Sequence, residues 1–213
     1  MQQMRKIFIT LFFISFLYVK AQDYEFDTMT LYSTKFNQLE TKTSNYTNSK
    51  ISSYSLRISN YTDYSEAKVF DYKNGKIHYF KINEVKSKNE ITTNFIYQNS
   101  YNIETDEKLY SKYVYDFETV EESTDLKKVK LNVYKNSKKK KSIVYFDLNL
   151  KPNDSNLFHA FRLSCIHLFG FIQKFDINEN CIVESAKAVT HDGQIVEHTL
   201  LEYKKVNLIL RIP

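Results

Sequence analysis

Few residues of this chain stand in arrangements that could do chemistry. The chain has five histidines, His78, His159, His167, His191 and His198. None of them forms a His-x-x-x-His pair or has a cysteine at zinc-ligand spacing. Only three glycines occur, which leaves no G-x-S-x-G nucleophile turn, phosphate-binding loop or dinucleotide fingerprint. The sequence therefore predicts a protein that is not an enzyme and that has no catalytic residues, no cofactor and no metal site.

One segment resembles the opening of a calcium-binding loop. Asp176, Asn178 and Asn180 have the alternate spacing of the first ligands of such a loop. The remaining positions do not fit, because Cys181 stands where glycine is required and Lys187 stands where the bidentate glutamate belongs. We expect an ordinary loop here.

The first 21 residues have the pattern of a secretory signal peptide. Arg5 and Lys6 precede an apolar run, Ile7–Val19, and Val19-Lys20-Ala21 gives the small-x-small pattern of a cleavage site. The apolar run is shorter than the roughly 20 residues of a membrane-spanning helix. We therefore expect residues 1–21 to be a signal peptide and residues 22–213 to form a single secreted β-rich domain without a transmembrane segment.

The only cysteines, Cys165 and Cys181, lie in the exported part of the chain. In an oxidising compartment two such cysteines are expected to form a disulfide, which would stabilise the fold by about 3 kcal/mol in the chain-entropy model. The alternative is two separate buried thiols, because a free cysteine packs as a small apolar side chain.

The charge of the exported part is close to balanced. The signal segment holds Arg5, Lys6 and Lys20 and no acid, so its removal lowers the net charge from +5 to about +2. Such a chain has no strong field to attract nucleic acid. A lysine-rich run from Lys127 to Lys141 could bind acidic polysaccharide or anionic lipid headgroups, but the interpretation we favour is a solvated hairpin tip.

Alternation of apolar and polar residues with period two dominates the rest of the chain and predicts β-strands. The strongest local signal is the segment Ala67–Ile82, in which two aromatic runs flank Asn74-Gly75, a dipeptide typical of a type I′ hairpin. The stretch from Thr41 to Asn60 reads as a loop that grades into a strand from Tyr54. Further strands are predicted at Thr92–Tyr97, Leu109–Phe117, Lys127–Tyr134, Ser142–Leu150, Cys181–Thr190 and Gln194–Lys205, with a final strand at Val206–Ile212. Consecutive hairpins indicate a mainly β (α+β) fold, with a single antiparallel meander sheet or half-barrel.

One segment has the pattern of a helix. Asp154 and Ser155 are capping candidates, the run from 155 to 169 is apolar on nearly all sides, and Gly170 can end it. We expect this helix to pack on the sheet. Its large apolar side chains are the candidate ligand-binding residues, namely Phe158, Phe161, Leu168 and Phe169.

The N-terminal residues resemble those of a known group of proteins. The signal ending Val-Lys-Ala-Gln, at residues 19–22, and the Tyr24-Glu25-Phe26-Asp27 opening that follows look like those of small exported Bacteroidota proteins of unassigned function. The expected meander with an apolar helix on it is similar in architecture to the lipoprotein-carrier half-barrels of the Gram-negative envelope, although a fold does not fix a function.

Two functions remain open from the sequence. The first is an exported, non-enzymatic envelope protein that binds a hydrophobic or amphiphilic ligand, such as a lipid, on a curved aromatic sheet covered by the helix. The second is a structural or protein-interaction module of the envelope or cell surface, with another envelope protein as partner and no small ligand. Either protein would be periplasmic, associated with the outer membrane, or extracellular.

Overall fold

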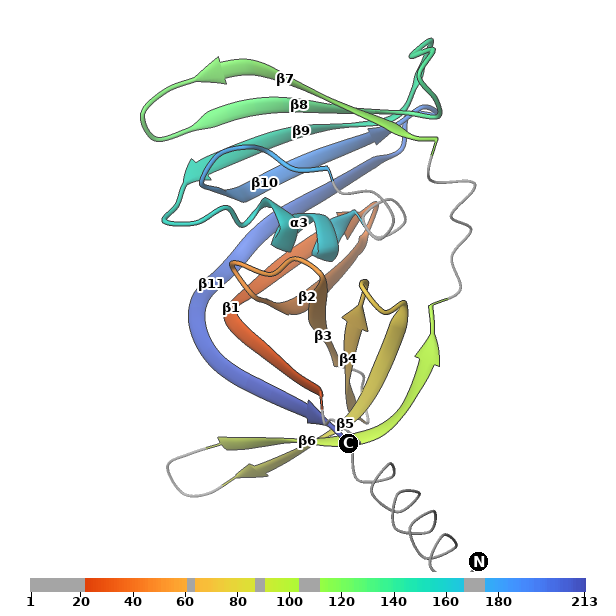
Figure 1. Ribbon diagram of the computed structural model, residues 1–213. Helices are drawn as coiled ribbons and strands as arrows, with labels where there is room; N and C mark the ends of the chain where they lie inside the picture. The colour runs from red at the N-terminus through yellow and green to blue at the C-terminus, as the bar shows by residue number, and fades with distance from the viewer. Residues whose placement is uncertain (1–21, 61–63, 87–90, 104–111, 167–174) are drawn as a thin grey trace, which may run out of the picture.

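The computed structural model describes residues 22–60, 64–86, 91–103, 112–166 and 175–213. The predicted signal peptide therefore lies outside the described residues. The eleven strands of the described residues belong to one open, strongly curved antiparallel sheet in the order β6-β5-β4-β3-β2-β1-β11-β10-β9-β8-β7 (Figure 1). The strands are β1 (Gln22–Phe36), β2 (Leu39–Thr47), β3 (Tyr54–Asn60), β4 (Ser65–Asp71), β5 (Lys76–Lys86), β6 (Ile91–Asn102), β7 (Val114–Glu122), β8 (Lys127–Tyr134), β9 (Ser142–Pro152), β10 (Cys181–Thr190) and β11 (Ile195–Ile212). The predicted mainly β fold is confirmed.

The two ends of the described chain meet in the middle of the sheet. β1 pairs with β11 along its whole length, from Gln22 opposite Ile212 to Phe36 opposite Val196. Two register shifts interrupt this pairing, between Phe26 and Thr28 and between Leu31 and Tyr32, and such irregularities increase strand bending. β11 is one continuous strand, so the prediction of a separate last strand at Val206–Ile212 is wrong. β2 likewise occupies part of the segment that was expected to be a loop.

The predicted hairpin at Asn74-Gly75 is present, but its turn is longer than expected. The strand pairing ends at Asp71 opposite Lys76, and Gly75 has a positive φ of 61° while Asn74 does not. A type I′ turn needs positive φ at both central residues. The Asp71 carboxylate instead accepts hydrogen bonds from the backbone and side-chain nitrogens of Asn74, at 2.9 and 2.7 Å, and so stabilises a wider turn.

The described residues contain one short helix, α3 (Phe158–Cys165), which packs against β1, β2 and β10. It is shorter at its start than predicted, because the side chain of Asn156, and not Asp154 or Ser155, accepts a hydrogen bond from the backbone nitrogen of Phe158 at 2.9 Å. Residues 167–169 of the predicted helix and Gly170 lie outside the described residues. From Phe158 to Ser164 every residue of the helix is buried, as an element that is apolar on most sides requires.

Apolar side chains form two main clusters. The upper core lies between α3 and the strands β1 and β8–β10, and its largest fully buried side chains are Tyr32, Leu131, Leu148, Leu150, Phe158 and Phe161. The lower core joins the first residues of β1 and the last of β11 to β3, β4 and β5, and comprises Tyr24, Phe26, Leu56, Ala67, Val69, Phe80, Leu210 and Ile212. β1 and β11 thus contribute to both cores.

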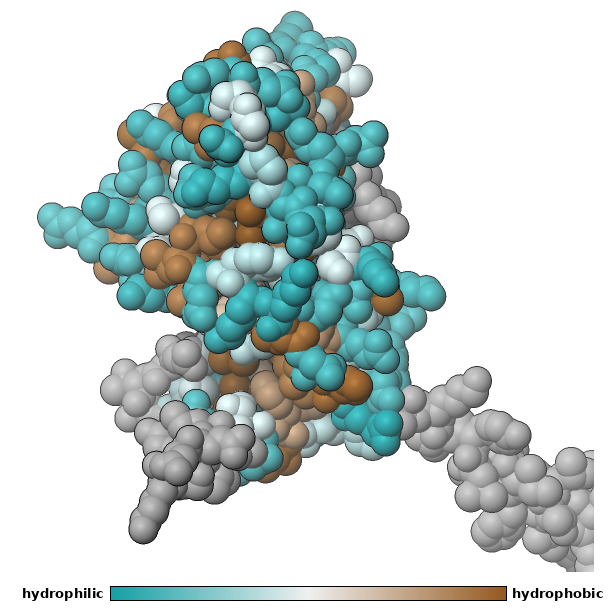
Figure 2. All heavy atoms as spheres, turned by 90° about the vertical axis from the view of Figure 1, so that its left-hand side faces the viewer, coloured by the Kyte–Doolittle hydropathy of each residue, from teal (hydrophilic) through white to brown (hydrophobic). Residues whose placement is uncertain are grey.

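The face around the bend of β1 and β11 is mixed in character. Apolar groups form separate patches among hydrophilic ones there (Figure 2), and β11 carries exposed Leu201 and Ile209. Among the residues that the structure describes, no helix has the length and apolar character needed to cross a membrane.

Candidate functional site

The predicted ligand-binding residues of the helix are core residues where the structure describes them. Phe158 and Phe161 are fully buried. The Phe161 ring packs edge-on against Tyr32 and His198, with centroid separations of 5.6 and 5.8 Å, and Phe158 packs against Phe117 at 5.7 Å. Leu168 and Phe169 lie outside the described residues. α3 therefore fills the upper core with these two rings.

The two cysteines are free thiols and not the predicted disulfide. Cys165 ends α3 and Cys181 begins β10, and both belong to the upper core or pack against it. Burial raises the pKa of the Cys181 thiol to about 12 and raises the pKa of the Cys165 thiol well above its ordinary value. The arrangement corresponds to the alternative of two separately packed cysteines.

Native alkylation of both thiols is expected to be slow. Only the thiolate reacts, and the raised pKa values leave almost none of it at pH 8. Iodoacetamide should modify the native protein at least about 100-fold more slowly than the urea-unfolded protein, followed by mass spectrometry. Equal rates would contradict the burial of the thiols. If the unfolded protein reacted only after reduction, the result would support the predicted disulfide.

Polar side chains hold α3 onto the sheet. Arg57 of β3 donates from Nη2 to the carbonyl oxygen of Leu163 at 2.8 Å, and so satisfies one of the carbonyl groups that a helix leaves unbonded at its C-terminal end. Arg162 of α3 is buried, and its guanidinium lies 5.5 Å from the ring centroid of Phe175. Burial lowers the pKa of both arginines from their ordinary values. These contacts give the helix a fixed position.

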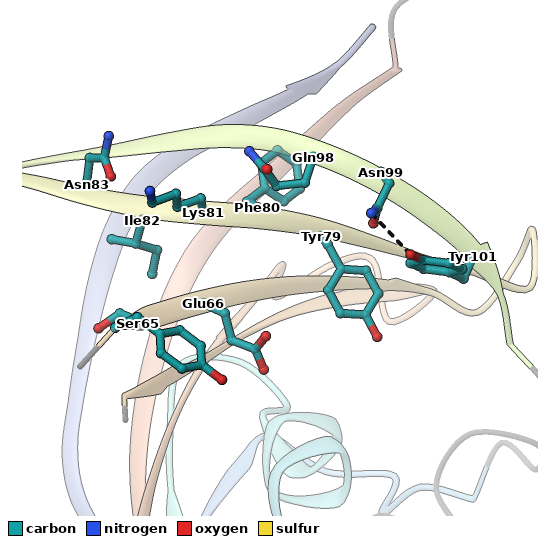
Figure 3. A pocket seen from close by; sticks show the side chains of 11 residues that line it. Ser65, Glu66, Tyr79, Phe80, Lys81, Ile82, Asn83, Gln98, Asn99 and Tyr101 are labelled. Atoms are coloured by element: carbon teal, nitrogen blue, oxygen red, sulfur yellow. Dashed lines mark hydrogen bonds between the residues drawn. The ribbon is translucent and has the colours of Figure 1, made fainter. Parts of the chain in front are cut away.

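The face of the sheet on which α3 packs also carries an open groove, towards the β6 edge. Arg57 lies opposite Lys68, Lys68 opposite Tyr79 and Tyr79 opposite Asn99 across successive strands, so these side chains share a face. The groove has a volume of about 860 Å³. Its lining comes from the start of β4 and from β5 and β6, and consists of Tyr64, Ser65, Glu66, Tyr79, Phe80, Lys81, Ile82, Asn83, Gln98, Asn99 and Tyr101 (Figure 3).

Tyrosine rings form one end of this groove. Tyr79 and Tyr101 meet edge to face, with ring centroids 5.3 Å apart and an interplanar angle of 88°. Tyr101 is 57% exposed and Tyr64 is 58% exposed. The side-chain nitrogen of Asn99 donates to the Tyr101 hydroxyl at 3.2 Å and so orients that ring (Figure 3). Exposed aromatic rings beside amide groups can hold a ligand by stacking and by hydrogen bonds together.

A β-bulge places polar side chains in the groove. Tyr79 lies opposite Asn99 but Phe80 lies opposite Tyr97, so Gln98 is an extra residue in β6. Bulges re-aim side chains and are enriched next to functional sites. Gln98 is exposed, and its side-chain nitrogen donates to the carbonyl oxygens of Ile96 and Tyr97 at 3.1 and 3.3 Å.

A chain of buried hydrogen bonds fixes the strands that carry the groove. The Tyr24 hydroxyl donates to Asp71 Oδ2 at 2.7 Å, so its oxygen is left to accept from His78 Nε2 at 3.0 Å. His78 Nδ1 then accepts from Ser100 Oγ at 2.6 Å. Burial would raise the pKa of Asp71, but the hydrogen bonds from Tyr24 and Asn74 lower it overall, and burial lowers the pKa of His78. The chain links β1, β4, β5 and β6, and none of its members lines the groove.

The first part of the lysine-rich run lies in β8, and its residues 135–141 form the tip of the β8–β9 hairpin, where the tip was predicted. A small pocket of about 230 Å³ there is lined by Tyr134, Lys135, Asn136, Lys138, Lys139, Lys140 and Lys141. Lys139 has a positive φ of 45° and pairs with Asp116 at 2.8 Å. The Asp176 segment is a loop in which the Asp176 carboxylate accepts hydrogen bonds from Asn156 and from the backbone of Ile177. Within the described residues, no three histidine, cysteine, aspartate or glutamate side chains are grouped as metal ligands.

Sequence reasoning did not identify the groove. Its tyrosines occur in strands that were predicted, but period-two alternation gives only the face of each residue and not which strands curve together. The available signal was the odd-numbered series on β5, in which the half-buried Tyr79 and the exposed Lys81 and Asn83 alternate with the buried His78 and Phe80.

Comparison with solved structures finds distant structural similarity. No protein-family model matches the sequence, and no curated protein matches it. Among solved structures, the chain is similar to a DUF1329 family protein from Desulfovibrio piger ATCC 29098, with 7% sequence identity and a TM-score of 0.23. The similarity covers 88% of this chain and 87% of that protein. A TM-score of this size carries no argument about function.

Proposed function

We propose that the protein is an exported, non-enzymatic binding protein of the cell envelope, and that it binds an amphiphilic ligand in the groove over β4, β5 and β6. The observation that carries this proposal is the meeting of exposed tyrosine rings with amide and charged side chains in an open groove of about 860 Å³. Ligand sites of proteins typically occupy about 300–1,000 Å³ and combine apolar walls with a few polar groups.

The proposal moves the ligand from the helix to the outer strands. Phe158 and Phe161 are buried among other side chains, whereas Tyr64 and Tyr101 are accessible. The buried hydrogen bonds from Tyr24 through His78 to Ser100 hold β5 and β6 in place, so the site is formed before the ligand arrives. Export itself rests on the predicted signal peptide.

Binding of n-octyl β-D-glucoside, titrated below its micelle concentration into the ¹⁵N-labelled exported domain, tests this function. We expect chemical-shift changes at the amides of Tyr79, Lys81 and Asn99. Replacing Tyr101 by Ala should weaken binding about 10-fold or more, because an aromatic contact of about 0.5–1.5 kcal/mol is lost together with buried ring area.

Leu201→Ala provides the matched control, because Leu201 is also an exposed apolar residue in a strand but lies on β11, outside the groove. It should bind the probe as the parent protein does. Absence of any shift in the groove, or equal weakening by both substitutions, would overturn the proposal and favour the protein-interaction module as the function.

A further inference from the structure

We propose that the polar part of the amphiphilic ligand of the groove is an acidic oligosaccharide. This inference rests on the proposed function, because it names the chemical class of that polar part for the same site. A sugar ring presents C–H groups on its faces and hydroxyl groups around its rim, so a site for it needs an aromatic surface with hydrogen-bonding groups beside it. An acidic sugar needs a cation as well.

The aromatic surface is provided by Tyr79 and Tyr101. Their rings are almost perpendicular, at 88°, so they offer two walls of a corner and not a single flat platform (Figure 3). The Lys68 ammonium lies 5.1 Å from the ring centroid of Tyr79. Because Tyr101 is more than half exposed, its ring is the surface on which a sugar ring can stack.

The hydrogen-bonding groups are the amides of Asn83, Gln98 and Asn99. Each side-chain amide has a donor nitrogen and an acceptor oxygen, the combination that matches a hydroxyl group, which both donates and accepts. Gln98 is the extra residue of the β6 bulge, and Asn99 already bonds the Tyr101 hydroxyl. The three amides lie along the groove, with Asn99 beside Tyr101 and Asn83 at the end away from the two tyrosine rings (Figure 3). A chain of hydroxyl-bearing rings can form hydrogen bonds with these amides, which a hydrocarbon chain cannot.

The cation is Lys81. Glu66, its neighbour across the strands, forms an ion pair with Lys68 at 2.5 Å. Lys81 is exposed and makes no ion pair with any residue that the structure describes. The groove therefore offers the ammonium group of Lys81 to an anionic group of the ligand. The C6 carboxylate of a uronic acid residue is such a group on an oligosaccharide.

Titration of the ¹⁵N-labelled domain with trigalacturonate, with its neutral counterpart galactotriose and with the sugar-free detergent octyl tetraoxyethylene tests the inference. We expect trigalacturonate to shift the groove amides and to bind at least about 5-fold more tightly than galactotriose, because an exposed ion pair contributes up to about 1 kcal/mol. Replacing Lys81 by Gln should remove this difference, while Lys76→Gln, an exposed lysine of β5 outside the groove, should keep it.

The results separate this inference from the proposed function. Binding of octyl tetraoxyethylene in the groove without trigalacturonate binding would overturn the oligosaccharide inference and leave the amphiphile-binding function standing. Equal affinity for the acidic and the neutral trisaccharide would also overturn the inference. If neither saccharide nor detergent shifts the groove amides, both the inference and the function fail.

Discussion

Replacing Phe161 by Asp is expected to unfold the domain of residues 22–213 at 25 °C. Phe161 is 0% exposed and its ring packs against Tyr32, Phe158 and His198. Removing such a ring costs about 3–5 kcal/mol, and burying a carboxylate without a partner adds several more. The sum is comparable to the whole free energy of unfolding of an ordinary domain, about 5–15 kcal/mol. Near-UV circular dichroism and the dispersion of amide resonances would report the loss of tertiary structure.

The control is Leu201→Asp, which introduces the same charge at a residue that is 47% exposed on β11. It should change the free energy of unfolding by no more than about 0.5 kcal/mol. A folded Phe161→Asp protein that had lost only its ligand would contradict the structure and would return the helix to the role of a cover over the binding surface.

Acidification from pH 7 to pH 5 is expected to lower the free energy of unfolding by at least about 2 kcal/mol. The main contribution comes from His198, whose pKa burial lowers to about 4, from an ordinary value of 6.5. The unfolded chain therefore binds a proton before the folded one does. The free energy of unfolding begins to decrease as the pH falls through 6.5 and goes on decreasing until about pH 4. At pH 5 the protonation of His198 in the unfolded chain accounts for a decrease of about 2 kcal/mol.

Two further histidines act in the same direction. Burial also lowers the pKa of His78 and of His159, so both take up protons on unfolding in acid. Urea unfolding curves at pH 7, 6 and 5 measure the effect, and His198→Gln should show a shallower decline than the parent protein. Stability that is constant over this range, or an unchanged decline in His198→Gln, would contradict the burial of His198.

Much of the strand content could be predicted because it depends on local patterns. β8, for example, was predicted with the bounds Lys127–Tyr134 that it has in the structure. β2 was missed for a physical reason. Its inward residues include Asn45 and Thr47, which are fully buried but polar, so the strand lacks the apolar alternation by which a half-buried strand is recognised.

The candidate site depended on information that the sequence does not hold locally. The groove needs three strands to curve together, a bulge at Gln98, and Tyr64 placed just before β4. The length of β11 likewise could not be predicted from local sequence. The exposed pair Lys204 and Lys205 interrupts its apolar pattern, but its pairing with β1 continues past them. The apolar helix, by contrast, was predicted from local signals, namely its capping candidates, its apolar positions and Gly170, but the burial of Phe158 and Phe161 makes it part of the core.

The central pairing of β1 with β11 determines the order in which the molecule can be assembled. In a chain that is synthesised N-terminus first, β2 to β6 can add to one edge of β1, hairpin by hairpin, while the other edge of β1 still has no neighbour. That neighbour, β11, follows all the other described strands in the sequence, and because β1 and β11 contribute to both cores, neither core is complete until β11 is in place. Contacts between such distant residues form slowly, so completion of the native state is a late event that follows synthesis of residue 212.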